Sequence, residues 1–316
     1  MAKRFIGARQ TTIADEIVLT GIGVHSGAPV SITLHPAEAD TGIRFLIAKG
    51  DEIVADIPAD FRAVTNVTLC TVLGDGNGAN VATVEHLLAA LRGLCVDNVY
   101  VEIDSAEVPI MDGSAAPFVA AIDDCGIVEL DAPRRFVKVL KPIRVEDGGC
   151  WGELLPHSGF FLDVEIDFEI EVIGRQRMSV ELSPGVFRAE LARARTFGFM
   201  SDVEKLWAAG RALGASLDNT VVLGDDRVIN PEGLRFANEF VRHKTLDAVG
   251  DLALSGAPLL AAYRSKRGGH RLNAMVLQAL FADRTAWTLV DAPRIREIGR
   301  GDVAFGAVAN FAADRT

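Results

Sequence analysis

The sequence lacks the features that mark secreted, membrane-spanning and nucleic-acid-binding proteins. Its 316 residues include only four cysteines, widely spaced and without a CxxC pair, so we predict reduced thiols rather than a disulfide framework. No apolar run follows the first basic residues and no uncharged run reaches about 18 residues, so we expect neither a signal peptide nor a spanning helix. The 32 basic residues are outnumbered by 43 acidic ones, which argues against a general nucleic-acid binder. We therefore expect a cytoplasmic protein without a nucleic-acid partner.

The length of the chain favours two domains, because a single core usually stops growing at about 250–300 residues. In each half, segments with strand composition come first and segments with helical periodicity follow. The expected strands include 16–20, 29–34, 98–103, 136–140, 153–155, 161–168 and 178–182, and the expected helices are 83–92, 114–126, 237–254 and 271–282. We predict an α+β fold of two similar domains, 1–130 and 136–316, each a mainly antiparallel sheet packed with helices, in a two-domain sandwich.

One segment, 239–251, combines a histidine, a lysine and two aspartates in helix-forming sequence. His243 and Asp247 are spaced (i, i+4), so both side chains leave the same face of a helix within one turn. An imidazole and a carboxylate placed in this way can bind one divalent cation. Asp251 lies two turns beyond His243 and points into the same neighbourhood, with Lys244 at the rim of that face.

His86 is the candidate third ligand, because it follows Glu85 near the start of a predicted helix. Adjacent residues on a helix diverge by about 100°, so Glu85 would act on water at the metal rather than bind the metal itself. Three protein ligands with one open position form the pattern of a catalytic zinc site, although the HExxH motif of zinc proteases is absent. On these residues alone, the alternative is a pair of unrelated surface helices with charged faces.

Six ordered motifs give the chain a resemblance to a known family along nearly its whole length. They are 21–27 (GIGVHSG), 83–87 (TVEHL), 109–118 (PIMDGSAAPF), 193–200 (RARTFGFM), 240–251 (FVRHKTLDAVGD) and 269–270 (GH). With these motifs the chain resembles the UDP-3-O-acyl-N-acetylglucosamine deacetylases, the zinc amidases of the committed step of lipid A synthesis. The resemblance implies hydrolysis of the N-acetyl group of UDP-3-O-[(R)-3-hydroxyacyl]-N-acetylglucosamine, giving UDP-3-O-acyl-glucosamine and acetate at a site between the two domains.

The resemblance also implies roles for individual residues. His86, His243 and Asp247 would hold the zinc, and Glu85 would be the general base that activates water there. The hydroxyl of Thr196 would share stabilisation of the oxyanion. The remaining roles concern three charged residues: His270 would stabilise the anion and protonate the leaving amine, Asp251 would orient His270 and keep it charged, and Lys244 would lie near the phosphates of the substrate.

Substrate contacts are expected in two further places. The family builds a passage for the acyl chain after the Thr-Phe motif, and the corresponding residues here include Phe197, Phe199, Met200, Val203, Ala212, Ala215 and Ser216. On sequence alone, core packing is the alternative for that apolar stripe. The segment before His270 is longer and more basic than the family pattern, so Arg264, Lys266 and Arg267 are candidates for the pyrophosphate, with a solvated loop as the alternative. Cys70 is expected near the metal, or as a structural free thiol.

Several questions stay open at this level. The alternatives to the leading function are a metal-dependent deacetylase of another N-acetylated sugar and a non-catalytic binder of acylated nucleotide sugars. A shell of two histidines and one aspartate suits both zinc and ferrous iron. A monomer is the default expectation, and no basic amphipathic segment predicts a membrane anchor, although a lipid substrate leaves transient membrane contact open.

Overall fold

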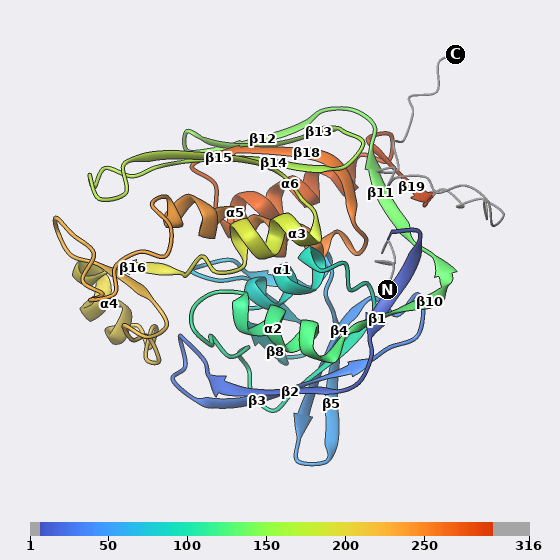
Figure 1. Ribbon diagram of the computed structural model, residues 1–316, viewed down its shortest axis with the longest axis horizontal. Helices are drawn as coiled ribbons and strands as arrows, with labels where there is room; N and C mark the ends of the chain where they lie inside the picture. Colours follow the sequence, from blue (N-terminus) through green and yellow to red (C-terminus); the bar gives the residue numbers. More distant parts are fainter. Residues whose placement is uncertain (1–6, 293–316) are drawn as a thin grey trace, which may run out of the picture.

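The computed structural model describes residues 7–292 and forms two outer β-sheets with helices layered between them (Figure 1). The first sheet has the order β2-β3-β9-β4-β5 and the second contains β12, β13, β18, β14 and β15, extended by β11 and β19. Their strands are β2 (Ile17–Ile22), β3 (Pro29–Pro36), β4 (Ile43–Lys49), β5 (Glu52–Pro58), β9 (Val99–Ile103), β11 (Arg135–Val139), β12 (Ile143–Asp147), β13 (Cys150–Pro156), β14 (Phe160–Asp167), β15 (Arg175–Glu181), β18 (Leu259–Lys266) and β19 (Trp287–Asp291). The helices between the sheets are α1 (Glu85–Gly93), α2 (Ala116–Cys125), α5 (Glu239–Leu252) and α6 (His270–Ala282).

The two halves repeat one topology. In the first half, β2, β3 and β9 pair antiparallel in turn, β9 lies parallel to β4, and β4 pairs antiparallel with β5. In the second half, β12, β13, β18, β14 and β15 repeat the same sequence of pairings. Each half then places one helix before the central strand (α1 or α5) and one after it (α2 or α6). The prediction of two similar α+β units is therefore confirmed, while the domain limits 1–130 and 136–316 stay predictions.

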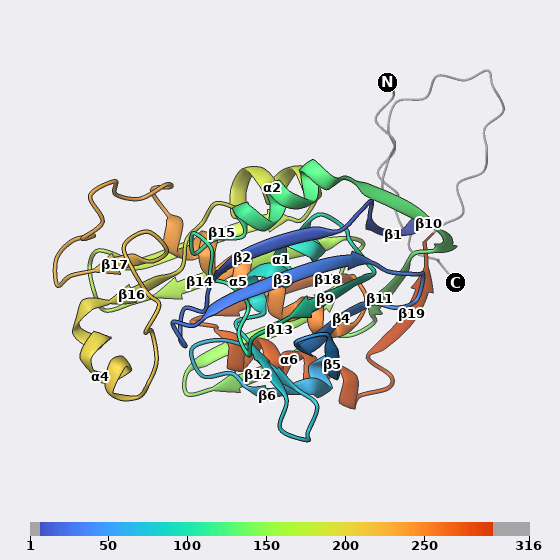
Figure 2. The ribbon, with the colours of Figure 1, turned by 90° about the horizontal axis from the view of Figure 1, so that it is seen from below.

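Smaller elements connect and decorate the two units. Their bounds are β1 (Arg9–Ile13), β6 (Val64–Asn66), β7 (Val72–Gly74), β8 (Asn80–Ala82), β10 (Ile127–Pro133), α3 (Pro184–Val186), β16 (Phe197–Phe199), α4 (Val203–Ala208) and β17 (Val221–Leu223), with short helical turns at Phe61–Ala63, Phe187–Leu191, Met200–Asp202 and Ala253–Ser255. Strand β1 pairs with β10, so the start of the first unit is tied to the segment that leads into the second. Figures 1 and 2 both show α4 at one end of the molecule, away from the two sheets.

Alternating side chains explain why the sheets pack on the helices. In β3, Val30, Ile32 and Leu34 are buried and alternate with more exposed residues, as expected for a strand with one covered face. The covered faces of both sheets and the helices between them share one continuous hydrophobic cluster. Within residues 7–292, no helix is long and apolar enough to cross a lipid bilayer.

Helices α1 and α5 lie at the centre of this layered arrangement and touch closely. All nine residues of α1 are buried, which is the pattern of a helix enclosed on every side. At the crossing, a Cβ atom added to Gly250 would lie 2.0 Å from the carbonyl oxygen of Glu85. Glycine is therefore required at position 250, because any larger side chain would push the N-terminal turn of α1 away from α5.

Candidate metal centre and active site

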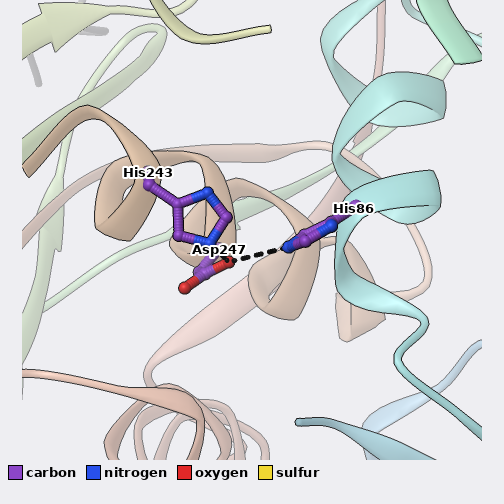
Figure 3. Close-up of side chains that lie close together, drawn as sticks. All are labelled: His86, His243 and Asp247. Carbon is purple, nitrogen blue, oxygen red and sulfur yellow. Dashed lines mark ion pairs between the residues drawn. The ribbon is translucent and has the colours of Figure 1, made fainter. Parts of the chain in front are cut away.

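Three side chains from the two central helices converge on one buried point (Figure 3). His86 comes from the first turn of α1, and His243 and Asp247 come from successive turns of α5. One ligand atom from each residue lies within 4.8 Å of the others. The Nε2 atom of His243 is 3.3 Å from Asp247 Oδ1, and the Nε2 atom of His86 is 3.6 Å from the same oxygen. The predicted set of metal ligands is thus brought together from both halves of the chain.

The chemistry of this cluster fits a divalent cation. Asp247 Oδ1 is buried and has no hydrogen-bond partner among the described residues, although a buried carboxylate oxygen normally has one. The Nδ1–H group of His243 donates to the carbonyl oxygen of Ala194 at 3.0 Å, so its Nε2 atom presents a lone pair to the cluster. Two imidazole nitrogens and one carboxylate oxygen with an open fourth position form a common catalytic zinc shell.

Burial sets the protonation of the groups around this point. It lowers the pKa of His243 to about 3, so this imidazole is neutral and able to ligate. Burial also acts to lower the pKa of Lys244, but Asp247 outweighs it and the pKa of the ammonium rises. Lys244 Nζ lies 2.8 Å from Asp247 Oδ2, so the lysine holds the carboxylate oxygen that faces away from the two histidines.

A second set of charged groups, Glu85, His270 and Asp251, borders the three ligands. The Nδ1 atom of His270 lies 2.9 Å from Asp251 Oδ2, and its Nε2 atom lies 3.9 Å from Glu85 Oε1. Burial acts to lower the pKa of His270, but Asp251 and Glu85 outweigh it and raise the pKa to about 9. Burial raises the pKa of the Glu85 carboxyl, an effect that His270 and His86 partly offset. The site therefore holds a cationic imidazole facing a buried carboxylate.

Three polar residues that the sequence did not identify as site residues hold Glu85 and Asp251 in position. Thr71 donates its backbone N–H to Glu85 Oε2 at 3.1 Å and its hydroxyl to Asp251 Oδ1 at 2.6 Å, so it joins both carboxylates. Asn273 donates to Asp251 Oδ2 at 2.8 Å, and the hydroxyl of Tyr263 donates to Asn273 Oδ1. Asn273 stands three residues after His270 on α6, so helical spacing carried a signal for it. Nothing in the local sequence pointed to Thr71.

A buried ion pair anchors the segment that supports His243. Glu239, in the first turn of α5, is fully buried and accepts hydrogen bonds from the backbone N–H, Nε and Nη2 of Arg195 and from the backbone N–H of Arg235. These bonds fix the chain next to Ala194, whose carbonyl orients His243. Thr196 is the next residue after Arg195, and its backbone N–H donates to the carbonyl of Gly113 at 2.8 Å. Its assigned role in oxyanion stabilisation stays a prediction.

The glycine-rich motif 21–27 is fixed to the start of α1 through Glu107. The carboxylate of Glu107 accepts the backbone N–H groups of His25 and Ser26, both at 2.9 Å. It also accepts the hydroxyl of Thr83 at 3.0 Å, two residues before Glu85. This arrangement ties a loop between β2 and β3 to the start of α1, where Glu85 and His86 lie.

A polar and aromatic cavity of about 440 Å³ lies beside the cluster formed by His86, His243 and Asp247. Lys244, Arg267, Phe168 and Phe199 are among the residues that line it. Next to it, the ring of Phe197 lies against the ring of His243, with centroids 6.2 Å apart, and Lys244 Nζ lies 5.6 Å from the Phe197 centroid. The cavity therefore combines two cationic side chains and two acidic ones, Asp167 and Glu169, with aromatic surface close to the predicted metal ligands.

The structure corrects the expectation for Arg264 and Lys266. Both belong to strand β18 rather than to a loop, and strand side chains alternate between the two faces of a sheet. Tyr263 and Ser265 face the helices, so Arg264 and Lys266 point to the opposite face. There Arg264 pairs with Glu153 and Asp163, and Lys266 pairs with Glu165. Of the three predicted basic residues, Arg267 is the one that lines the cavity with Lys244.

The residues expected around the acyl chain fall into two groups. Phe197 and Phe199 form β16 next to the site, whereas Met200, Val203, Ala212, Ala215 and Ser216 belong to the segment that includes α4. This segment is largely exposed, and it presents Met200, Trp207, Leu213 and Leu217 to solvent. Core packing, the alternative for this apolar stripe, therefore does not describe the residues of α4 and the loop after it.

Cys70 is a buried free thiol near Glu85. Burial, reinforced by the charge of Glu85, raises the pKa of Cys70 to about 12. The sulfur is therefore a protonated thiol rather than a thiolate ligand, which is the form that binds metals. Of the two interpretations, a structural thiol packed close to the site agrees with this environment.

Comparison with known proteins agrees with the geometry. The family model described as UDP-3-O-acyl N-acetylglycosamine deacetylase matches residues 10–282. The chain is 52% identical to proteins named UDP-3-O-acyl-N-acetylglucosamine deacetylase from Brucella ovis and Brucella canis, over 91% of this chain and 100% of each relative. A protein of the same name from Brucella melitensis biotype 2 is 51% identical over the same shares of the two chains.

Proposed function

Because the chain belongs to the UDP-3-O-acyl N-acetylglycosamine deacetylase family, we propose that it is the zinc-dependent enzyme of the committed step of lipid A biosynthesis. Its substrate would be UDP-3-O-[(R)-3-hydroxyacyl]-N-acetylglucosamine, and its products acetate and UDP-3-O-acyl-glucosamine. The observation that carries the proposal is the buried convergence of His86, His243 and Asp247 beside Glu85 and His270. One ligand shell, one base and one acid are the groups that amide hydrolysis requires.

His86, His243 and Asp247 would hold the cation, with either zinc or ferrous iron suited to these donors. When bound, the metal would supply a Lewis acid that acidifies water and polarises the acetamide carbonyl. Lys244 would keep Asp247 oriented through its hydrogen bond to Oδ2, which leaves Oδ1 for the metal. The hydrogen bond from His243 to Ala194 would fix the imidazole in the tautomer that ligates through Nε2.

Glu85 would act as the general base. Thr71 holds Glu85 Oε2, so Oε1 is the oxygen free to take a proton from the attacking water. Burial raises the pKa of this carboxyl and so brings it toward the range in which a base is effective near neutral pH. The new C–O bond forms at the acetamide carbon, and Thr196 would donate to the oxygen that gains negative charge.

His270 would act as the general acid. With a pKa of about 9 its imidazole is protonated at neutral pH, and its Nε2 atom faces Glu85 across the site. As the C–N bond breaks, Nε2–H would donate its proton to the sugar nitrogen, so acetate and the free amine leave. Asp251 would hold Nδ1–H and stabilise the cation, with Thr71 and Asn273 fixing Asp251 in turn.

The remaining parts of the substrate have suitable neighbours. The cavity would offer the cations of Lys244 and Arg267 to the diphosphate, beside Phe199 and the acidic residues Asp167 and Glu169. The exposed apolar side chains of Met200, Trp207 and Leu213 lie on the segment that we assign to the acyl chain. An apolar segment at the site's edge favours an acylated substrate over a simple N-acetyl sugar, which is the alternative substrate class.

Acetate release from the acylated UDP-sugar by the metal-loaded protein tests this proposal. We expect Glu85→Gln to lower kcat/KM by roughly 100-fold or more, because that is the usual contribution of a positioned base. Metal content serves as the control, since Glu85 is not a ligand and the variant should keep its cation. If Glu85→Gln retained most of the wild-type kcat/KM, the assigned mechanism would be wrong. If a UDP-sugar without the acyl chain competed equally well, the assigned substrate would be wrong.

A further inference from the structure

A second cavity lies at the junction of the two halves, behind the helices that carry the metal ligands. Its volume is about 200 Å³, and its walls include Arg92, Asp97 and Asn98 from the first half and Arg134, Arg135 and Gly256 from the second. Arg92 stands in the last turn of α1, at the end opposite Glu85 and His86. Gly256 follows the short helical turn that ends α5. This junction cavity therefore contacts the far ends of both central helices.

The junction cavity contains a buried cation without a matching acceptor. The Arg92 side chain is more than nine-tenths buried, and its Nε and Nη1 atoms have no hydrogen-bond partner within residues 7–292. The carboxylate nearest to it is Asp97, whose Oδ1 atom is 3.8 Å from Arg92 Nη1, too far for a hydrogen bond. A guanidinium carries five N–H donors, and leaving several unpaired away from water is costly.

Asp97 cannot compensate Arg92, because other donors already occupy it. Arg134 Nε donates to Asp97 Oδ1 at 3.0 Å, and Arg134 Nη2 forms an ion pair with the same oxygen at 2.9 Å. The backbone N–H of Thr11 donates to Asp97 Oδ2 at 3.1 Å. Two buried guanidinium groups thus share one carboxylate, and the inner part of the cavity has an excess of one positive charge. Burial accordingly lowers the pKa of Arg92 to about 10, with Arg134 acting in the same direction.

We infer that the junction cavity is a binding site for a small oxyanion, with Arg92 as its principal donor. A phosphate-like anion would accept from the unpaired N–H groups of Arg92 and balance the excess charge that Arg92 and Arg134 share. The cavity volume of about 200 Å³ limits the ligand to a small anion. Asp40 and Asp60 also line the cavity and pair with Arg135 and Arg62, respectively, so these residues add no net positive charge that would attract a polyanion. An anion bound here would join the far ends of α1 and α5.

The measurement is the melting temperature of the full chain, in phosphate and in chloride at equal ionic strength. Because a ligand stabilises the state that binds it, we expect saturating phosphate to raise the Tm of the wild type by roughly 2 °C or more. Arg92→Met should show a clearly smaller phosphate gain than the wild type, and it should melt in chloride at or above the wild-type temperature because it removes an uncompensated buried charge. Arg188→Met, which removes an arginine half-exposed at the surface beside Asp123, is the matched control and should keep the gain.

The comparison between variants separates the junction cavity from the active site. Any phosphate that binds near Lys244 stabilises wild type and Arg92→Met alike, so the difference between them reports on Arg92. Equal phosphate gains in wild type and Arg92→Met would overturn the inference, as would no gain in the wild type. Should Arg92→Met fail to fold, calorimetric titration with phosphate compares wild type with Arg92→Lys. We expect Arg92→Lys to bind phosphate at least tenfold more weakly, because lysine lacks the planar guanidinium group, and equal affinity would overturn the inference. Titration with glycerol phosphate in parallel distinguishes a phosphate ester from free phosphate.

Discussion

Replacing Asp251 by asparagine tests whether the charge of His270 depends on the carboxylate behind it. The wild-type pair has Nδ1 and Oδ2 2.9 Å apart, and Asp251 is the main group that raises the pKa of His270 to about 9. Asparagine keeps the shape of the side chain and removes the negative charge, and its amide N–H group replaces one of the two acceptor oxygens that contact Thr71, His270 and Asn273. The substitution should therefore lower the pKa of His270 while a side chain of the same size still occupies position 251.

The size of the effect follows from the protonated fraction of His270. With a pKa of about 9, about nine-tenths of His270 is protonated at pH 8 in the wild type. Loss of a neighbouring opposite charge shifts a pKa by about 1–3 units, and a fall of about 2 units leaves about one-tenth protonated at pH 8. At pH 6 both proteins would be mostly protonated. The variant should thus lose about tenfold more kcat/KM at pH 8 than at pH 6.

The assay is the pH dependence of kcat/KM for acetate release, from pH 5 to beyond the alkaline limb. Asp251→Asn should move the alkaline limb toward lower pH, whereas the wild type should lose activity near pH 9. Asp283→Asn, at an exposed carboxylate paired with Lys141, is the matched control and should leave the limb unchanged. An alkaline limb at the same pH in wild type and Asp251→Asn would refute the assignment of His270 as an acid controlled by Asp251.

Three further predictions concern stability. The pKa of His270 in the folded protein lies above its usual value of 6.5. Its contribution to the free energy of unfolding should therefore be full below pH 6.5 and lost as the pH rises through about 9. Urea unfolding at several pH values would detect this loss. Glu239→Ala should cost roughly 3–5 kcal/mol, because it removes the buried carboxylate that pairs with buried Arg195. Glu190→Ala removes a half-exposed carboxylate paired with Arg242 and should cost less than about 1 kcal/mol, and equal losses in chemical unfolding would contradict this. Gly250→Ala should lower both Tm and metal content, because its Cβ would meet the Glu85 carbonyl, whereas Gly185→Ala has open space and should change neither.

The sequence predicted what depends on local periodicity. His243 and Asp247 could be paired from their (i, i+4) spacing alone, and the alternation of apolar residues predicted strands such as β3. The same rule bears on Arg264 and Lys266, which the sequence offered as candidates for the pyrophosphate, with a solvated loop as the alternative. As members of β18 they alternate with buried Tyr263 and Ser265, and so point away from the site.

Other features depend on contacts that no local pattern encodes. Thr71 joins Glu85 and Asp251 although 180 residues separate its hydroxyl from its aspartate partner in the sequence. The requirement for glycine at position 250 appears only when α1 crosses α5. Arg92 Nε and Nη1 have no hydrogen-bond partner within residues 7–292, which is likewise a result of tertiary packing, since the nearest carboxylate is already held by Arg134. The repeated topology of the two halves could be predicted only as an order of elements, because the sequence shows no residue-level repeat.

The most direct test of the central claim is metal stoichiometry measured together with activity. We expect one zinc or iron ion per chain of wild type, loss of activity on chelation, and recovery when the metal is restored. Asp247→Ala should retain the fold but bind far less metal, because it removes the one carboxylate that His86 and His243 share. Full activity after complete chelation, or an unchanged metal content in Asp247→Ala, would contradict the assignment of His86, His243 and Asp247 as the catalytic metal centre.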